Sequence, residues 1–150
     1  MSGGGEVRGE ILHLCVATER GPKHGVESVQ VEAGRGITGD VHAGPGIRQV
    51  SALADESIET MRRKLPDLDV GAFGENLITR GIDWKAVPVG RRLRLGDDVV
   101  AQVSQHGKVC HTRCRIYYDT GDCIMPTEGT FLIARTSGEL RPGDAIVSEP

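Results

Sequence analysis

The sequence predicts a mainly β fold, a β-barrel with a few peripheral helices. Many short apolar stretches alternate with glycine, of which the 150-residue chain has 21. Only one segment, residues 52–65, has a clear helical pattern. A chain of many short strands and one helix is most simply built as a closed sheet with the helix at its edge. We expect one domain over residues 7–150, after a disordered tail at residues 1–6.

The predicted strands are short segments of alternating apolar residues between turn signals. The clearest is a hairpin over residues 92–104 (RLRLGDDVVAQVS), in which Gly96-Asp97-Asp98 forms the turn. The other predicted strands lie at residues 10–17, 26–33, 77–78, 131–134 and 145–148.

The predicted helix has apolar residues at the spacing of one helical face. These residues are Ala54, Ile58, Met61 and Leu65. Ser51 is expected to cap the N-terminus, and Pro66 is expected to end the helix. Acidic residues near its start and basic residues near its end suit the helix dipole.

Composition excludes several classes of function. The net charge is −3 and aromatic residues make up 3% of the chain, which argues against binding nucleic acid. No apolar run approaches the ~20 residues of a membrane span. The N-terminus (MSGGGEVRGE) lacks the apolar core of a signal peptide, so we expect a cytoplasmic protein with reduced thiols.

The segment 107–123 (GKVCHTRCRIYYDTGDC) contains three of the four cysteines. Cationic neighbours stabilise a thiolate, the form that acts as nucleophile and as soft-metal ligand. A reactive or ligating role is therefore predicted first for Cys110, and then for Cys114 and Cys123. Cys15 differs, because it lies in an apolar strand and is expected to be a small buried side chain.

Two other interpretations of this segment remain open. Zinc could take its three cysteines together with His106 or His111, although the C-x3-C and C-x8-C spacings differ from the usual paired C-x2-C. A structural disulfide would leave one of the three cysteines unpaired, and the expected compartment is reducing.

A second polar region is the glycine-rich stretch 36–46 (GITGDVHAGPG), followed by Arg48. On an extended backbone Asp40 and His42 point the same way, and Arg48 suits a bidentate anion. The alternative is an ordinary glycine loop with a solvated Asp–Arg pair. Asn76, in FGENL (73–77), could equally be a turn residue.

These motifs occur in a characteristic order. The order is GDVHAG (39–44), RQVS (48–51), FGENL (73–77), VGRRLRLGD (89–97) and GKVCHTRCRIYYDTGDCIMPTEG (107–129). Together they resemble the MOSC domain, named for the C-terminal domain of molybdenum-cofactor sulfurase. The resemblance covers roughly residues 7–148, and the last motif resembles a stand-alone bacterial subgroup.

The resemblance implies a barrel-like β fold that handles the molybdenum cofactor, a molybdenum–pterin dithiolene compound. Cys110 matches the family's key cysteine, which is thought to carry a persulfide or to ligate molybdenum. Cys110 is therefore the implied metal-binding residue, and Cys114 and Cys123 are further metal-binding candidates because they lie in the same segment. The implied cofactor-binding residues are Asp40, His42, Arg48, Asn76, Lys108, His111, Arg113 and Arg115.

The chain departs from the family pattern at several positions. Val41 stands where many members have Arg, and Val109 stands where Pro usually precedes the key cysteine. Cys114 and Cys123 are additional to many MOSC proteins, and could resolve a persulfide or form a second metal site. No lysine has a recognisable context for the pyridoxal phosphate of the full-length sulfurase.

Three hypotheses follow. The first is a molybdenum-cofactor-binding domain that carries sulfur or delivers cofactor through Cys110, with cofactor-biosynthesis proteins or molybdoenzymes as partners. The second is a cofactor-dependent reductase of N-hydroxylated compounds, which would need an electron-donor partner because no flavin or iron–sulfur motif is visible. The third is a non-catalytic, zinc-stabilised binding module.

Overall fold

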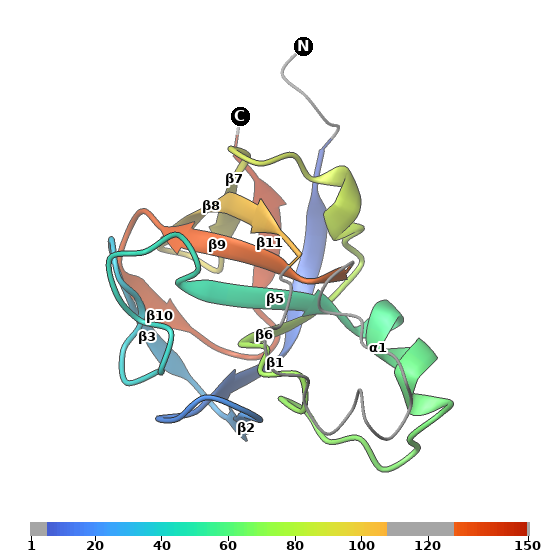
Figure 1. The fold of residues 1–150 in the computed structure, drawn as a ribbon. Helices are drawn as coiled ribbons and strands as arrows, with labels where there is room; N and C mark the ends of the chain where they lie inside the picture. Colours follow the sequence, from blue (N-terminus) through green and yellow to red (C-terminus); the bar gives the residue numbers. More distant parts are fainter. Residues whose placement is uncertain (1–5, 108–127, 150) are drawn as a thin grey trace.

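The computed structural model describes residues 6–107 and 128–149, and its main feature is a closed β-barrel of seven strands (Figure 1). Around the barrel the order is β11-β7-β8-β9-β5-β6-β1, and β1 pairs with β11 to close it. All neighbours are antiparallel except the parallel pair β5–β6. The strands are β1 (Arg8–Val16), β5 (Val50–Ala54), β6 (Leu77–Arg80), β7 (Arg92–Leu95), β8 (Val99–His106), β9 (Thr130–Ala134) and β11 (Ala145–Ser148). The predicted mainly β barrel is confirmed.

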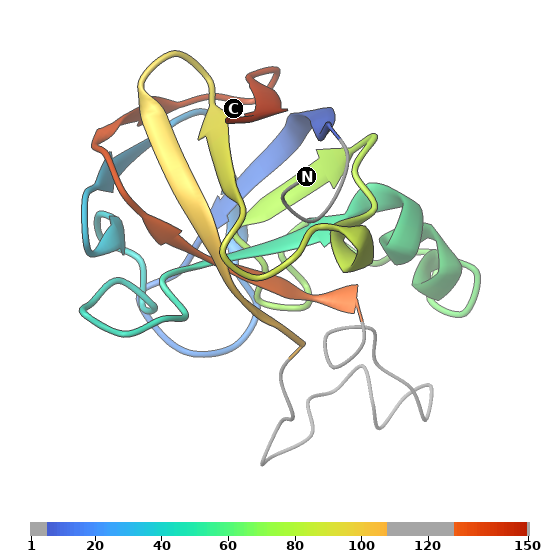
Figure 2. The same ribbon diagram turned by 90° about the horizontal axis from the view of Figure 1, so that it is seen from above.

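A smaller sheet packs against this barrel. It has the order β10-β3-β4, and β2 extends the large sheet beside β1. In the view of Figure 2 the strands surround a common interior, to which the small sheet contributes Val29, Val31, Ile37 and Leu140. These strands are β2 (His24–Val26), β3 (Val29–Glu32), β4 (Gly36–Ile37) and β10 (Gly138–Leu140).

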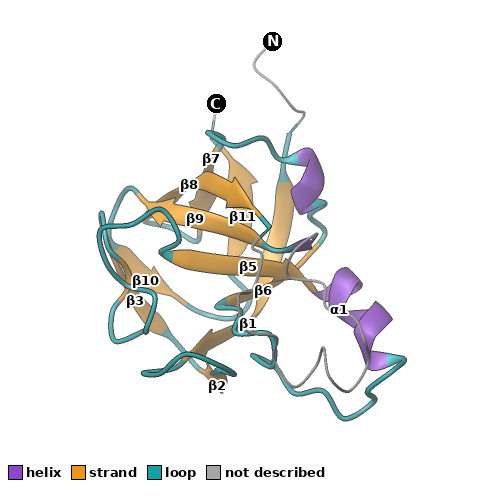
Figure 3. Cartoon of the chain, in the orientation of Figure 1, coloured by secondary structure: helices purple, strands orange, loops and turns teal. Residues whose placement is uncertain are grey.

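Two apolar clusters lie on opposite sides of the barrel wall. The interior is filled by aliphatic side chains such as Leu93, Val103 and Leu132. The second cluster lies outside the wall, where α1 (Asp55–Arg62) packs Ile58 and Met61 against β5, β6 and β9. Figure 3 shows α1 beside the end of β5, and the short 3-10 helix η1 (Trp84–Ala86) follows β6.

The predicted helix over residues 52–65 is wrong at its start. Residues 50–54 form strand β5, whose five residues are all buried, and α1 begins at Asp55. Ser51 does not cap a helix; its backbone N–H donates to Asn76 Oδ1 at 3.0 Å. A strand buried on both faces has no alternating pattern, so its apolar run merges with that of the following helix. At the other end, a turn at Lys64 and Leu65 bonds to Met61 O.

The predicted hairpin is confirmed, since β7 and β8 pair antiparallel with Leu93 opposite Ala101. The predicted strand at residues 26–33 divides into β2 and β3, and the two-residue β4 and three-residue β10 were not predicted. Within residues 6–107 and 128–149, no helix is long and apolar enough to cross a membrane.

Candidate functional site

Three loops bring four ionisable side chains together outside the barrel wall, a group that we name the Lys23 cluster. Its members are Lys23, Asp40, His42 and Glu75. Lys23 lies between β1 and β2, Asp40 and His42 lie between β4 and β5, and Glu75 lies just before β6. The cluster therefore depends on the tertiary fold rather than on any one segment.

Asp40 holds the glycine-rich loop against the end of β1. Its Oδ1 accepts the backbone N–H of Ala17 at 3.1 Å, and its Oδ2 accepts that of His42 at 3.1 Å. Ala17 O in turn accepts the backbone N–H of Val41 at 2.8 Å. The predicted cofactor residue Asp40 is 5% exposed, so its carboxylate faces the protein.

Lys23 is the centre of the cluster. Its Nζ donates to Asp40 Oδ1 at 2.9 Å and to Asp40 Oδ2 at 2.8 Å, and it lies 2.8 Å from His42 Nδ1. Burial lowers the pKa of Lys23 against the opposing effect of Asp40. Burial alone would raise the pKa of Asp40, but hydrogen bonds from Lys23 and His42 N–H lower it. The two groups form a buried ion pair, with both side chains 0% exposed.

Glu75 is a second buried carboxyl beside this pair. Burial raises its pKa to about 7, against the lowering effect of backbone N–H groups in its own turn and of Lys23. Its Oε1 accepts the N–H of Phe73 at 2.9 Å, whereas its Oε2 has no hydrogen-bond partner among the described residues. Burial also raises the pKa of the Cys15 thiol to about 12, with a further contribution from Glu75. Cys15 is thus a buried side chain, as predicted.

Asn76 joins β5 to β1 from the start of β6. Its Oδ1 accepts the N–H of Ser51 at 3.0 Å, and its Nδ2 donates to Cys15 O at 3.0 Å. The side chain is fully buried and both of its polar atoms contact the protein. A direct cofactor contact of Asn76 stays a prediction; the observed bonds position the strands under the cluster.

Arg48 is an exposed cation in the loop between β4 and β5. Its guanidinium lies 5.9 Å from the centre of the Phe131 ring, and its Nε donates to Gln105 Oε1 at 3.1 Å. Gln105 Nε2 donates in turn to Gly107 O at 2.8 Å. Arg48 is therefore linked to the end of β8, directly before the cysteine segment.

Several predicted site residues lie outside the described residues. These are Lys108, Cys110, His111, Arg113, Cys114, Arg115 and Cys123. Of the predicted residues that the structure describes, Asp40 and His42 share one cluster, and Asn76 lies beneath it. Arg48, in the loop before β5, contacts Gln105 of β8 and Phe131 of β9.

His106, one of the possible zinc ligands, has both ring nitrogens engaged. Its Nδ1 lies 3.0 Å from Thr130 Oγ1, and its Nε2 lies 2.6 Å from Val87 O. Since a carbonyl only accepts, Nε2 carries a proton and is not a metal ligand in this arrangement. Among the described residues, no group of three His, Cys, Asp or Glu side chains could hold a metal ion.

Sequence reasoning missed Lys23 and Glu75. Their chemistry comes from burial next to Asp40 and Cys15, which are distant in sequence. The only local signal for Glu75 was its place in FGENL, where Asn76 was selected instead.

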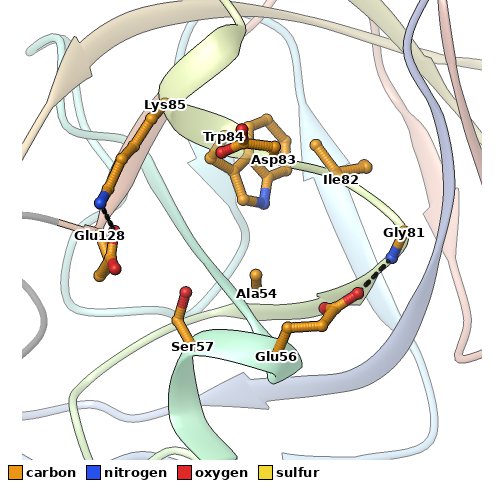
Figure 4. Close-up of a pocket in the computed structure, with 9 residues that line it drawn as sticks. All are labelled: Ala54, Glu56, Ser57, Gly81, Ile82, Asp83, Trp84, Lys85 and Glu128. Atoms are coloured by element: carbon orange, nitrogen blue, oxygen red, sulfur yellow. Dashed lines mark hydrogen bonds and ion pairs between the residues drawn. The ribbon is translucent and has the colours of Figure 1, made fainter. Parts of the chain in front are cut away.

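A pocket of about 410 Å³ lies between the start of α1 and the loop after β6, and none of the predicted site residues that the structure describes lines it (Figure 4). Its charged residues are Glu56, Asp83, Lys85 and Glu128. Lys85 pairs with Glu128 at 2.8 Å, and Glu56 accepts the N–H of Gly81 at 2.9 Å. Three carboxylates against one ammonium among the described lining residues do not suit an anionic cofactor.

The protein is thus a closed seven-stranded β-barrel with a buried polar cluster on its outer face. The sequence pattern of the MOSC domain matches residues 38–147, from the glycine-rich loop to β11. The chain therefore belongs to the MOSC domain family.

Solved structures share the fold at low sequence identity. The YuaD protein of Bacillus subtilis is 16% identical, with a TM-score of 0.80 over 98% of this chain and 100% of that chain. YiiM of Geobacillus stearothermophilus and YiiM of Escherichia coli are each 20% identical with TM-scores of 0.70. They cover 95% and 96% of this chain, and 75% and 70% of their own chains.

One curated relative is a protein of Gibberella moniliformis named "Reductase". It is 37% identical over 83 residues, which are 50% of this chain and 15% of that protein. The chain thus matches only a small part of that relative's length.

Proposed function

We propose that this protein binds the molybdenum cofactor on the outer barrel face that carries His42 and Arg48. The observation that supports this most is the link from Arg48 through Gln105 to Gly107. These hydrogen bonds connect the loop that carries Arg48 to Gly107, three positions before Cys110. Both parts lie within the stretch that matches the MOSC domain, a family associated with this cofactor.

The described residues suit such a ligand in part. Arg48 offers an exposed guanidinium for the phosphate, and His42 offers a ring whose side chain is 26% exposed. A Cβ added at Gly39, Gly44 or Gly46 would meet nothing within 4 Å, so a ligand could approach this backbone closely. Asp40 and Asn76 are buried and would act by holding the loop and strands in place.

The proposed role of the cysteine segment comes from its sequence. A thiolate at Cys110, favoured by the cations Lys108, His111, Arg113 and Arg115, would carry sulfur or ligate the metal. In the sulfur-carrier form, a persulfide made by a sulfur-donor partner gives its outer sulfur to an acceptor, and the Cys110 thiolate leaves. When bound, the cofactor would supply a redox-active molybdenum centre. Partners would be cofactor-biosynthesis proteins or molybdoenzymes.

Analysis of protein purified without oxygen tests this function. Molybdenum, pterin, zinc and labile sulfur are measured per chain in the wild type and in Cys110→Ser. We expect molybdenum and pterin in the wild type, and their loss or the loss of labile sulfur in Cys110→Ser. Cys15→Ala is the matched control and should keep both, because that thiol is buried. Wild type that takes up no cofactor when supplied with it would contradict the proposal, and stoichiometric zinc in its place would favour the zinc-stabilised module.

A second candidate function is reduction of N-hydroxylated compounds by the bound cofactor. It is favoured by the curated relative named "Reductase". The assay supplies an electron donor and a hydroxylamine-type substrate to cofactor-loaded protein. Turnover that requires loading supports the reductase, and its absence at full loading leaves sulfur or cofactor transfer.

A further inference from the structure

Lys23 contacts His42 from inside the protein, and no sequence pattern predicted a role for it. Lys23 Nζ lies 2.8 Å from His42 Nδ1 and 2.9 and 2.8 Å from the two Asp40 oxygens. We propose that Lys23 is a positioning residue that fixes the His42 ring in its neutral form with the proton on Nε2. The use of that proton rests on the proposed function, but the assignment of the ring does not.

The argument begins with the donors of the ammonium group. A charged lysine has three N–H donors and no acceptor, and here its Nζ faces the two Asp40 oxygens and His42 Nδ1. The hydrogen bonds and the negative charge of Asp40 favour the ammonium over the neutral amine, whereas burial alone disfavours it. The atom of His42 that faces an ammonium must offer a lone pair.

Among the described residues, Asp40 competes with Lys23 for the ring, because a carboxylate attracts a proton to the nearest imidazole nitrogen. The distances decide between the two. Asp40 Oδ2 lies 3.7 Å from His42 Nδ1, while Lys23 Nζ lies 2.8 Å from it. Both Asp40 oxygens also accept backbone N–H groups, from Ala17 and from His42 itself. A proton on Nδ1 would point at an ammonium and leave that N–H without an acceptor.

This arrangement assigns separate tasks to His42 and Arg48. The neutral His42 ring presents Nε2–H as a donor toward an oxygen acceptor and adds no charge. Arg48 supplies the positive charge for an anionic group. A ring free to exchange tautomers would present a donor only part of the time, so Lys23 would raise affinity by pre-organisation.

Nitrogen NMR of the cofactor-free protein at pH 7 tests the assignment. The chain has five histidines, and the signals of His42 are identified as those lost in His42→Gln. Two-bond correlations distinguish a protonated ring nitrogen from an unprotonated one. We expect an unprotonated Nδ1 and a protonated Nε2 in the wild type. Lys23→Met should lose this single-tautomer signature and give a mixture, whereas Lys85→Met, which removes an exposed ion-paired lysine, should keep it.

Wild-type His42 with a proton on Nδ1, or on both nitrogens, would overturn the assignment without the use of any variant. A folded Lys23→Met that keeps the wild-type signature would also overturn it. Cofactor retention is then measured separately, and we expect it to fall in Lys23→Met. If the wild type shows the expected tautomer but takes up no cofactor, the proposed function fails and the positioning role stands.

Discussion

The barrel interior and the Lys23 cluster are both buried, but they are built from different groups. The interior consists mainly of aliphatic side chains, with Leu93 and Leu132 at 0% exposure. The cluster buries an ammonium and two carboxyls in loops outside the wall. The interior stabilises the protein roughly in proportion to apolar area, whereas the charges of Lys23 and Asp40 depend on each other and on a few specific hydrogen bonds.

This difference indicates which part of the protein is the candidate functional site. Removing charges from water is costly, and the attraction between them often does no more than offset that cost. An apolar contact would hold the same loops without this desolvation free energy. Charged groups that are buried, mutually positioned and adjacent to exposed polar side chains are typical of functional sites. The comparison therefore supports the outer face, rather than the acidic pocket beside α1, as the site.

The largest expected effect comes from removing one charge of the buried pair. Asp40→Asn keeps the side-chain volume but leaves Lys23 without a counterion, so we expect a loss of about 3–5 kcal/mol in the free energy of unfolding. Denaturant unfolding measures it. The matched control is Glu10→Gln, which breaks the exposed pair with Arg80 and should hardly change the free energy of unfolding. If both variants lost the same small free energy of unfolding, the buried pair would contribute no more to stability than the exposed one.

The interior should respond to volume instead of charge. Leu132→Ala is expected to cost about 3 kcal/mol, because it leaves a cavity in the barrel, whereas Leu132→Met should cost below about 1.5 kcal/mol. The folded fraction of either variant should bind cofactor like the wild type. A fully folded Leu132 variant that binds cofactor more weakly than the wild type would contradict the view that the interior and the site are independent.

Glu75 gives the comparison a pH dependence. Its pKa is raised from 4.5 to about 7, so between these values the folded protein holds a proton that the unfolded chain has released. Stability therefore falls as pH rises through this window, by up to about 3 kcal/mol. Glu75→Gln should remove this decline, so the difference between variant and wild type grows in the variant's favour from pH 4.5 to 8. Parallel curves from urea unfolding would contradict the raised pKa.

The fold class could be predicted from the sequence because alternation and turns are local signals. The hairpin of β7 and β8 shows this, with Gly96 at a φ of 62° in its turn. The start of α1 was mispredicted because β5 is apolar on both faces. The strands β4 and β10 are too short to carry a periodic pattern.

The candidate site was predictable only in part. Asp40 and His42 were selected because they alternate in one motif, and they do share one cluster. Lys23 was missed because a buried lysine has no sequence signature; its partner lies 17 residues away and meets it only through the fold. The position of Asn76 was noticed, but its bonds to Ser51 and Cys15 join three strands that only the tertiary structure brings together.

Cofactor binding by Arg48→Ala tests the central claim most directly. The cofactor is supplied without oxygen from a donor molybdoenzyme, and its affinity is compared for the wild type, Arg48→Ala and Arg135→Ala. Arg135 is a matched control, because its Nε donates to Gln102 of β8 at 2.8 Å, as Arg48 does to Gln105. We expect Arg48→Ala to bind about tenfold more weakly or worse, corresponding to about 1.4 kcal/mol, and Arg135→Ala to bind like the wild type. Equal affinity of all three proteins would contradict a cofactor site on this face.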